Sequence, residues 1–395
     1  MPTRPSDHIK LFIPGPVEVH PDILDAQARW MYGHRMPECA ALFEAIEPKL
    51  QAVFQTERPV LISASSGTGL WEGASRNCVR SRVLHCVNGA FSERWAEVSA
   101  MNGKEVEVLA AEPGTAIKPA AVAEALAAGV FDALAVVHNE TSAGVLNPIE
   151  DIARAVRSLP GGDDIVILVD AVSAVSGVDI RPDAWDLDVV LTSSQKAFAL
   201  PPGLAFCSVS ERAMKRAVTV PNRGYYFDFP TLLKALEKFQ TPATPAISLL
   251  WALDLQLDRI LAEGLFNRFD RHLAMRDRTL AWARDRDFSL RAEEGYASPT
   301  VSCIDNTYGW DIGHLNKFLR TRGMILGNGY GTLKNITWRI GHMGELTVPD
   351  IDTLLGALDD YLAANGDAGS GVSGASRASG GVSGGASTSS TAAGR

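Results

Sequence analysis

Two residues that could do chemistry together, Asp170 and Lys196, each follow a run of apolar residues. Asp170 ends the run Ile-Val-Ile-Leu-Val of residues 165–169, and residues 189–193 lead into Ser194-Gln195-Lys196. Because ligands of α/β sheets bind at the carboxyl ends of the strands, both side chains are predicted at one ligand-binding edge. A lysine there can form an imine with an aldehyde cofactor, and a carboxylate can keep a pyridine nitrogen protonated, as pyridoxal phosphate (PLP) chemistry requires. Taken alone, such a pair is more often a helix-capping Asp and a solvated Lys.

A loop of small residues provides a place for a phosphate. Residues 65–69, Ser-Ser-Gly-Thr-Gly, follow the apolar run 60–64 and open a helical pattern over residues 70–79. Backbone N–H groups at such a helix start can close on an anion. The rival interpretation is a dinucleotide fingerprint, because the glycines resemble G-x-G-x-x-G. That fingerprint needs an acidic residue at the end of the next strand, where Asn88 stands, so we favour a phosphate over NAD.

Three further segments could serve the same site. Phe91 follows the apolar run 82–87 and could stack on a flat heterocycle or fill the core. Residues 138–144, His-Asn-Glu-Thr-Ser-Ala-Gly, end another predicted strand with polar side chains. Arg339 lies in the apolar run 336–340, where it needs an anionic partner. A substrate carboxylate or an internal salt bridge would satisfy it equally well.

The elements that must position these residues alternate along the chain. Short apolar runs alternate with helical patterns between residues 58 and 210, and several runs are apolar on both faces. This pattern predicts a three-layer α/β domain with a mainly parallel sheet. A smaller α+β domain is predicted after it, with long helices over 247–262 and 266–285, strands over 300–304 and 336–340, and helices over 312–322 and 350–364.

Composition excludes several classes of protein. The chain has 395 residues, 46% of them hydrophobic, and a net charge of −9. It has no basic cluster, so we expect no nucleic-acid partner. No apolar run approaches the ~18 residues of a membrane span, and the N-terminus lacks a signal-peptide pattern, so a cytoplasmic protein is expected. Its five cysteines form no C-x-x-C pair, which predicts free thiols and no metal site.

The last 30 residues differ from the rest. Residues 366–395 are nearly all Gly, Ser, Ala and Thr, a composition that predicts a disordered tail. Residues 381–385 match the G-x-S-x-G elbow of serine hydrolases. That elbow needs a strand before it and a helix after it, and neither is predicted here, so we reject a hydrolase.

Taken together, these segments resemble the class V aminotransferases, a branch of the fold type I PLP enzymes. The members that the sequence is most similar to are the alanine–glyoxylate and serine–glyoxylate types. The likeness runs from Pro14-Gly15-Pro16 to about Ala364. It is strongest at residues 193–197, Ser-Ser-Gln-Lys-Ala, with Pro-Pro-Gly at 201–203, and continues in residues 168–173 and 138–144.

The resemblance implies a fold and a set of roles. The fold is a large three-layer α/β/α domain with a small C-terminal α+β domain. Lys196 is the Schiff-base residue and moves the proton between the substrate and the cofactor. The resemblance places Asp170 on the pyridine nitrogen, Phe91 on the ring face, Ser142 near the ring, Ser66, Gly67, Thr68 and Gln195 on the phosphate, and Arg339 and Gly15 at the substrate.

The resemblance also implies a homodimer with shared active sites. Residues 241–245, Thr-Pro-Ala-Thr-Pro, resemble the segment that reaches the phosphate of the other subunit, and of Thr241 and Thr244 we favour Thr244. The implied domains are an N-terminal segment over 1–20 that reaches the active site, a PLP-binding domain over 21–255, and a small domain over 256–365. The implied reaction moves an amino group from serine, alanine or aspartate to glyoxylate or pyruvate.

Three alternatives remain at this point. Aminoethylphosphonate–pyruvate transamination uses the same scaffold, and its phosphonate would need an additional cation, for which Arg35 is a candidate. A cysteine desulfurase needs a nucleophilic Cys on a mobile loop, but Cys303 lies in a predicted strand. A non-catalytic subunit that kept the fold is disfavoured by the presence of both Lys196 and Asp170.

Overall fold

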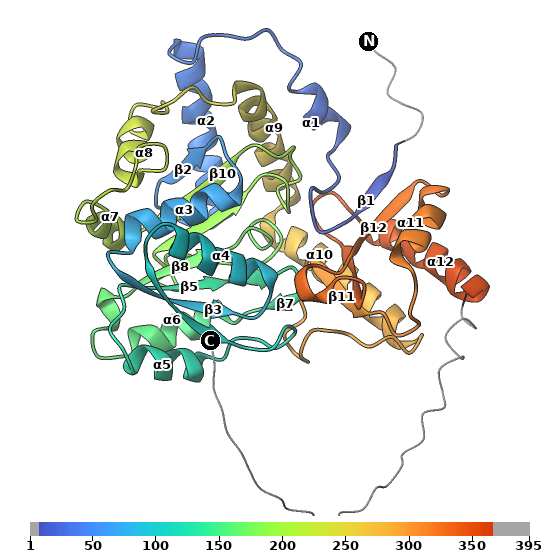
Figure 1. The fold of residues 1–395 in the computed structure, drawn as a ribbon. Coiled ribbons are helices and arrows are strands. Elements are labelled where there is room, and N and C mark those ends of the chain that lie inside the picture. The colour runs from blue at the N-terminus through green and yellow to red at the C-terminus, as the bar shows by residue number, and fades with distance from the viewer. Residues whose placement is uncertain (1–7, 366–395) are drawn as a thin grey trace, which may run out of the picture.

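A seven-stranded sheet forms the centre of the computed structural model, which describes residues 8–365 (Figure 1). The strand order is β2-β10-β9-β8-β5-β3-β4, and every neighbouring pair is parallel except the two that β10 makes. The strands are β2 (Val60–Ser63), β3 (Arg82–Val87), β4 (Glu105–Ala110), β5 (Ala133–Val137), β8 (Val166–Asp170), β9 (Val189–Ser193) and β10 (Ala205–Val209).

Helices cover both faces of this sheet, which explains why its central strands are apolar throughout. In β5, Leu134 and Val136 join one apolar core, whereas Ala133, Ala135 and Val137 join the other. The first core contains side chains of α2 (Pro37–Phe54), α5 (Pro119–Ala127), α6 (Ile149–Arg157) and α9 (Ile247–Glu263). The second contains side chains of α3 (Gly67–Cys78), α4 (Ala90–Met101), α7 (Glu211–Ala217) and α8 (Phe229–Leu236).

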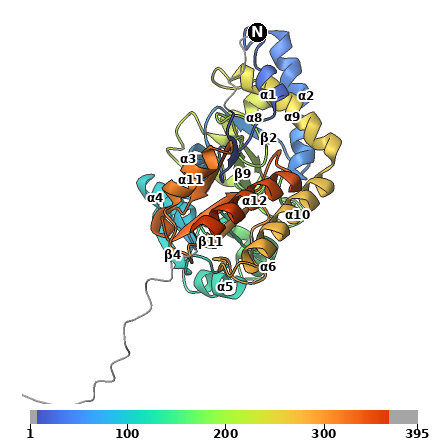
Figure 2. The same cartoon turned by 90° about the vertical axis from the view of Figure 1, so that its right-hand side faces the viewer.

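A second sheet of four strands, in the order β1-β12-β13-β11, lies beside the first (Figures 1 and 2). Its strands are β1 (Lys10–Phe12), β11 (Val301–Asp305), β12 (Met324–Asn328) and β13 (Thr337–Gly341). An apolar core rich in tryptophan joins it to α10 (Leu265–Arg284), α11 (Ile312–Arg320) and α12 (Val348–Asn365). The remaining elements are α1 (Pro21–Asp25), β6 (Asn139–Glu140), β7 (Val145–Leu146), η1 (Gly162–Asp164) and η2 (Gly331–Leu333).

The chain start belongs to the second sheet and then crosses toward the first. Strand β1 pairs with β12, and a few residues later the backbone N–H of Val17 donates to the carbonyl of Gln195, at 3.1 Å. The N-terminal segment therefore lies over the loop that carries Lys196.

The predicted domain limits stay a prediction. The proposed boundary between residues 255 and 256 falls inside α9. The predicted disordered tail, residues 366–395, lies outside the described residues. Within residues 8–365, no helix has the length and apolar character needed to cross a membrane.

Candidate active site

A cavity of about 350 Å³ lies where the two sheets meet, at the carboxyl ends of β8 and β9. Nine of the eleven predicted site residues line it. They are Gly15, Ser66, Gly67, Thr68, Phe91, Asp170, Gln195, Lys196 and Arg339. Residues from six separate segments thus converge on one cavity, as α/β sheets commonly arrange their ligand sites.

Lys196 is buried in the loop after β9, with its side chain 9% exposed. Its Nζ donates a hydrogen bond to the carbonyl of Pro14. The next residue, Gly15, has φ +130°, and a Cβ there would lie 2.7 Å from Nζ, so only glycine fits this approach. Burial, and then the positive charge of Arg339, lower the pKa of Lys196 to about 8. The amine is therefore unprotonated more often near neutral pH than an exposed lysine would be.

Asp170 is the last residue of β8, and both of its carboxylate oxygens accept hydrogen bonds. Oδ1 accepts from the backbone N–H of Val172 at 2.7 Å, and Oδ2 accepts from Nε1 of Trp71 at 2.9 Å. Burial raises the pKa of Asp170 to about 7 despite these donors. A cationic N–H placed beside this carboxylate would stabilise its charged form, so the site suits a protonated heterocycle.

The start of α3 forms the anion-binding end of the cavity. Ser66 occupies the N-cap position without a side-chain capping bond. A Cβ on Gly67 would lie 2.7 Å from Cγ2 of Val172, so the glycine lets this backbone approach the sheet edge. Nearby, Ser193 Oγ and Gln195 Oε1 are buried without a hydrogen-bond partner in the described structure. The Ser193 hydroxyl and the N–H groups at the helix start can donate to the phosphate of PLP, whereas Gln195 Oε1 can only accept a hydrogen bond.

Arg339, on β13, brings a positive charge to the other end of the cavity. Its Nε donates to the carbonyl of Asn328 at 2.9 Å, and Nη1 donates to the carbonyl of Thr141 at 3.2 Å. Within residues 8–365 no carboxylate forms an ion pair with it, so the internal salt bridge considered from the sequence is not present. A buried guanidinium held only by carbonyls is suited to a ligand carboxylate.

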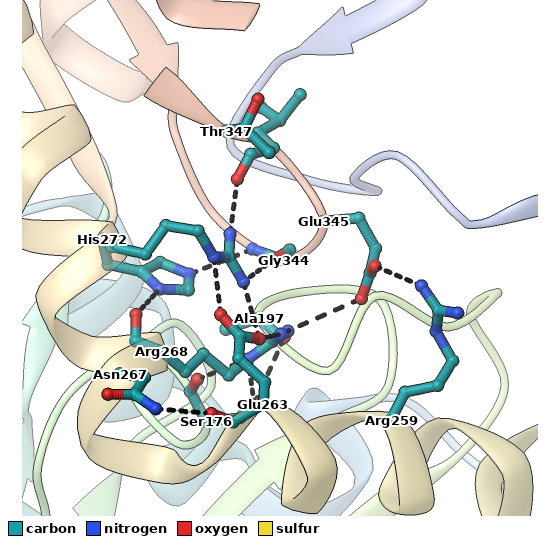
Figure 3. Close-up of polar contacts among 12 residues, drawn as sticks. Ser176, Ala197, Arg259, Glu263, Asn267, Arg268, His272, Gly344, Glu345 and Thr347 are labelled. Atoms are coloured by element: carbon teal, nitrogen blue, oxygen red, sulfur yellow. Dashed lines mark hydrogen bonds and ion pairs between the residues drawn. The ribbon is translucent and has the colours of Figure 1, made fainter. Parts of the chain in front are cut away.

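Arg268 of α10 donates hydrogen bonds to the backbone of the loop that carries Lys196 (Figure 3). Arg268 Nη2 donates to the carbonyl of Ala197 at 2.7 Å, and Nε donates to the carbonyl of Ser176 at 3.0 Å. Its charge is paired with Glu263 at 2.7 Å. His272, one turn further on α10, accepts from the backbone N–H of Gly344. The network joins the lysine loop to the segment that follows β13.

Two of the predicted site residues lie outside the cavity. The hydroxyl of Ser142 donates to Glu140 and accepts from the backbone N–H of Ala90, at 3.0 Å. It therefore fixes the start of α4, which carries Phe91. Thr244 is exposed in a separate hollow with Thr241 and Tyr226.

The structure also shows where the residues considered for the alternative reactions lie. Arg35 is not among the cavity residues, and it donates to Gln240 Oε1 at 3.1 Å and to the carbonyl of Thr241 at 2.9 Å. Cys303 lies in β11 directly opposite Arg339. Burial raises the pKa of the Cys303 thiol to about 11, which keeps it protonated at neutral pH.

Eleven of the twenty cavity residues were not among the predicted site residues, and Trp71, Thr141 and Val172 are three of them. Each of these three lies within four residues of a predicted site residue. Their position beside a strand end or a helix start is therefore the feature of the sequence that could have identified them. What the sequence could not show is the bond from Trp71 to Asp170, because it joins residues 99 positions apart.

The comparisons with known proteins agree with this geometry. The family described as aminotransferase class-V matches residues 28–278. The chain is 34% identical to a Synechococcus protein named soluble hydrogenase, small subunit, over 94% of this chain and 98% of that one. It is 32% identical to the L-aspartate–glyoxylate aminotransferase of Paracoccus denitrificans, over 85% of this chain and 87% of that one.

A solved structure gives the same result. The alanine–glyoxylate aminotransferase of Nostoc superposes with a TM-score of 0.85 at 30% identity, covering 92% of this chain and 97% of that chain. The fold is therefore that of the PLP-dependent aminotransferases, as the sequence predicted. The chain belongs to the class-V aminotransferase family, and the predicted family and enzyme class are confirmed.

Proposed function

We propose that the chain moves an amino group between a small amino acid, such as serine, alanine or aspartate, and a small 2-oxo acid, glyoxylate or pyruvate, with PLP as cofactor. One observation carries the proposal: Lys196, Asp170 and Arg339 line a single buried cavity. The reactions printed for the Paracoccus and Nostoc relatives support the choice of substrates.

PLP, when bound, supplies a ring that withdraws electrons from the α-carbon of the attached amino acid. The chain does the rest. With PLP bound, Asp170 would hold a proton on the ring nitrogen, and the start of α3, with the amide N–H of Gln195, would hold the phosphate. Arg339 fixes the substrate carboxylate, which orients the Cα–H bond toward Lys196. The unprotonated Nζ would then be placed to take the proton from the substrate's α-carbon and to hold it for return, a task for which its lowered pKa suits it.

Two further parts of the proposal concern the assembly and its location. The exposure of Thr244 outside the cavity of its own chain fits a homodimer in which it reaches the partner's phosphate. We assign the protein to the cytoplasm on the composition of the sequence. The position of Arg35 outside the cavity gives no support to a phosphonate substrate.

The test is the absorbance spectrum of the protein with PLP, before and after single amino acids are added. We expect a visible band from the lysine-bound cofactor that bleaches with a donor and returns with glyoxylate or pyruvate. Lys196→Ala should lose the band. Lys215→Ala, which removes an exposed lysine paired with Glu211 on α7, should keep it. A band that no amino acid bleaches would contradict the proposal.

A further inference from the structure

Tyr330 lines two hollows at once. The first is the active-site cavity of about 350 Å³. The second, of about 180 Å³, is lined largely by small or apolar residues that include Ala90, Ala111, Pro113 and Leu333. Tyr330 is the one described residue that the two linings share. Its side chain therefore forms part of the wall between them.

Three aromatic and cationic neighbours hold the Tyr330 ring in this position. The ring stacks on Phe91, with centroids 5.1 Å apart and planes 1° from parallel. Its hydroxyl accepts a hydrogen bond from Nη2 of Arg94, on the second turn of α4. The guanidinium carbons of Arg94 and Arg339 each lie 5.6 Å from the ring centroid. Such stacking and cation–π contacts favour one ring orientation.

This position lies beside the reacting part of a donor. A carboxylate on Arg339 would lie close to the Tyr330 ring. Lys196 Nζ, which must reach the α-carbon, lies 5.9 Å from the Phe91 ring on which Tyr330 stacks. The side chain of a donor held between Arg339 and Lys196 is therefore bounded by the Phe91–Tyr330 pair. Beyond that pair lies a hollow lined mainly by small or apolar residues, with Glu93 as the one charged residue of its described lining.

We propose that Tyr330 limits the length of the donor side chain by closing the active-site cavity toward the second hollow. The proposal rests on the proposed transamination and specifies its substrate class. Removing the ring would join the two hollows and admit unbranched apolar amino acids whose side chains are longer than that of aspartate, the longest of the proposed donors. When the wall of a pocket is rigid, kcat/KM for two substrates that differ by one methylene group differs by about 10- to 200-fold.

The experiment compares alanine, 2-aminobutyrate, norvaline and norleucine as donors in single-turnover bleaching of the PLP band. In Tyr330→Ala we expect the norleucine-to-alanine ratio of kcat/KM to rise about tenfold or more, because the longer chain can enter the second hollow. Tyr330→Phe is the matched control, since it keeps the ring and loses only the bond to Arg94. The ratio in Tyr330→Phe should stay within about twofold of the original protein.

The outcomes are distinguishable. If alanine bleaches the band and Tyr330→Ala slows every donor by the same factor, the role of Tyr330 is refuted and transamination stands. If Tyr330→Phe changes the ratio as much as Tyr330→Ala, the bond to Arg94 governs selection and the wall does not. If the unchanged protein forms the band but no amino acid bleaches it, the proposed function fails and this inference fails with it. Thermal unfolding of both variants checks that they fold.

Discussion

At the scale of single residues, Lys196 and Arg339 are coupled by charge. Both lie in the same buried cavity, and the guanidinium of Arg339 contributes to the lowered pKa of about 8 for Lys196. Only the unprotonated amine attacks the aldehyde of PLP. The rate at which cofactor-free protein captures PLP should therefore rise with pH through about pH 8 and level off above it, falling about tenfold per pH unit below.

Arg339→Gln should move this midpoint upward, because the neutral side chain no longer repels the protonated lysine. The rate of band formation, followed by stopped-flow absorbance across the pH range, measures it. Arg154→Gln removes an exposed arginine on α6 and should leave the midpoint unchanged. An unmoved midpoint in Arg339→Gln would show that burial alone lowers the pKa of Lys196.

The residues that sequence reasoning could place are those tied to strand ends. Asp170 and Lys196 end buried parallel strands, so the direction of the sheet brings them to one edge. Ser142 was harder to place, because its hydroxyl turns to Glu140 and α4 and away from the cavity. The stack of Tyr330 on Phe91 joins residues far apart in the sequence, and no local pattern encodes it.

At the scale of elements, α10 holds the lysine loop through Arg268 (Figure 3). Arg268 is 1% exposed and satisfies the carbonyls of Ala197 and Ser176. Arg268→Met would leave both carbonyls and the carboxylate of Glu263 without this donor. Glu263 is 27% exposed and keeps its ion pair with Arg271 at 2.7 Å, so the main cost is that of two buried carbonyls left without a donor, about 2–6 kcal/mol together. We expect the free energy of unfolding to fall by about that amount in urea titrations.

The matched control lies on the same helix. Arg278 of α10 forms an exposed ion pair with Asp352, with side chains 45% and 47% exposed. Arg278→Met should change the free energy of unfolding by less than about 1 kcal/mol, because water screens the pair. Equal losses in the two variants would contradict the role given to Arg268.

Helices and strands were predictable from the sequence where a single hydrophobic period dominates the segment. Strands β2, β3, β8 and β9 of the large sheet were expected within one residue of their limits, because apolar runs between turns predict buried strands. Helix α2 was not expected, and it carries Pro48 in its interior. Strand β1 has only three residues and β12 contains Gly327, so neither pattern is distinctive. Both acquire their structure from pairing: β1 pairs with β12, and β12 pairs with β13 as well.

At the scale of the whole molecule, the site depends on segments from both sheets. The N-terminal segment leaves β1, contacts Lys196 through Pro14 and bonds Gln195 from Val17. Arg339 comes from β13 of the same small sheet. A movement of the small sheet relative to the large one would therefore change the distance between the carboxylate-binding group and the lysine.

The proposed dimer can be tested with hybrids of two defective chains. If Thr244 serves the partner's phosphate, Thr244→Val weakens PLP binding in the homodimer and Lys196→Ala abolishes turnover. A hybrid then contains one site with an intact lysine and an intact threonine from the partner. Random mixing of equal amounts should restore activity in about a quarter of all sites at limiting PLP. If mixing restores no activity, Thr244 acts within its own chain or not at all. If a mixture made with Thr241→Val instead of Thr244→Val recovers activity, the contact is assigned to Thr241.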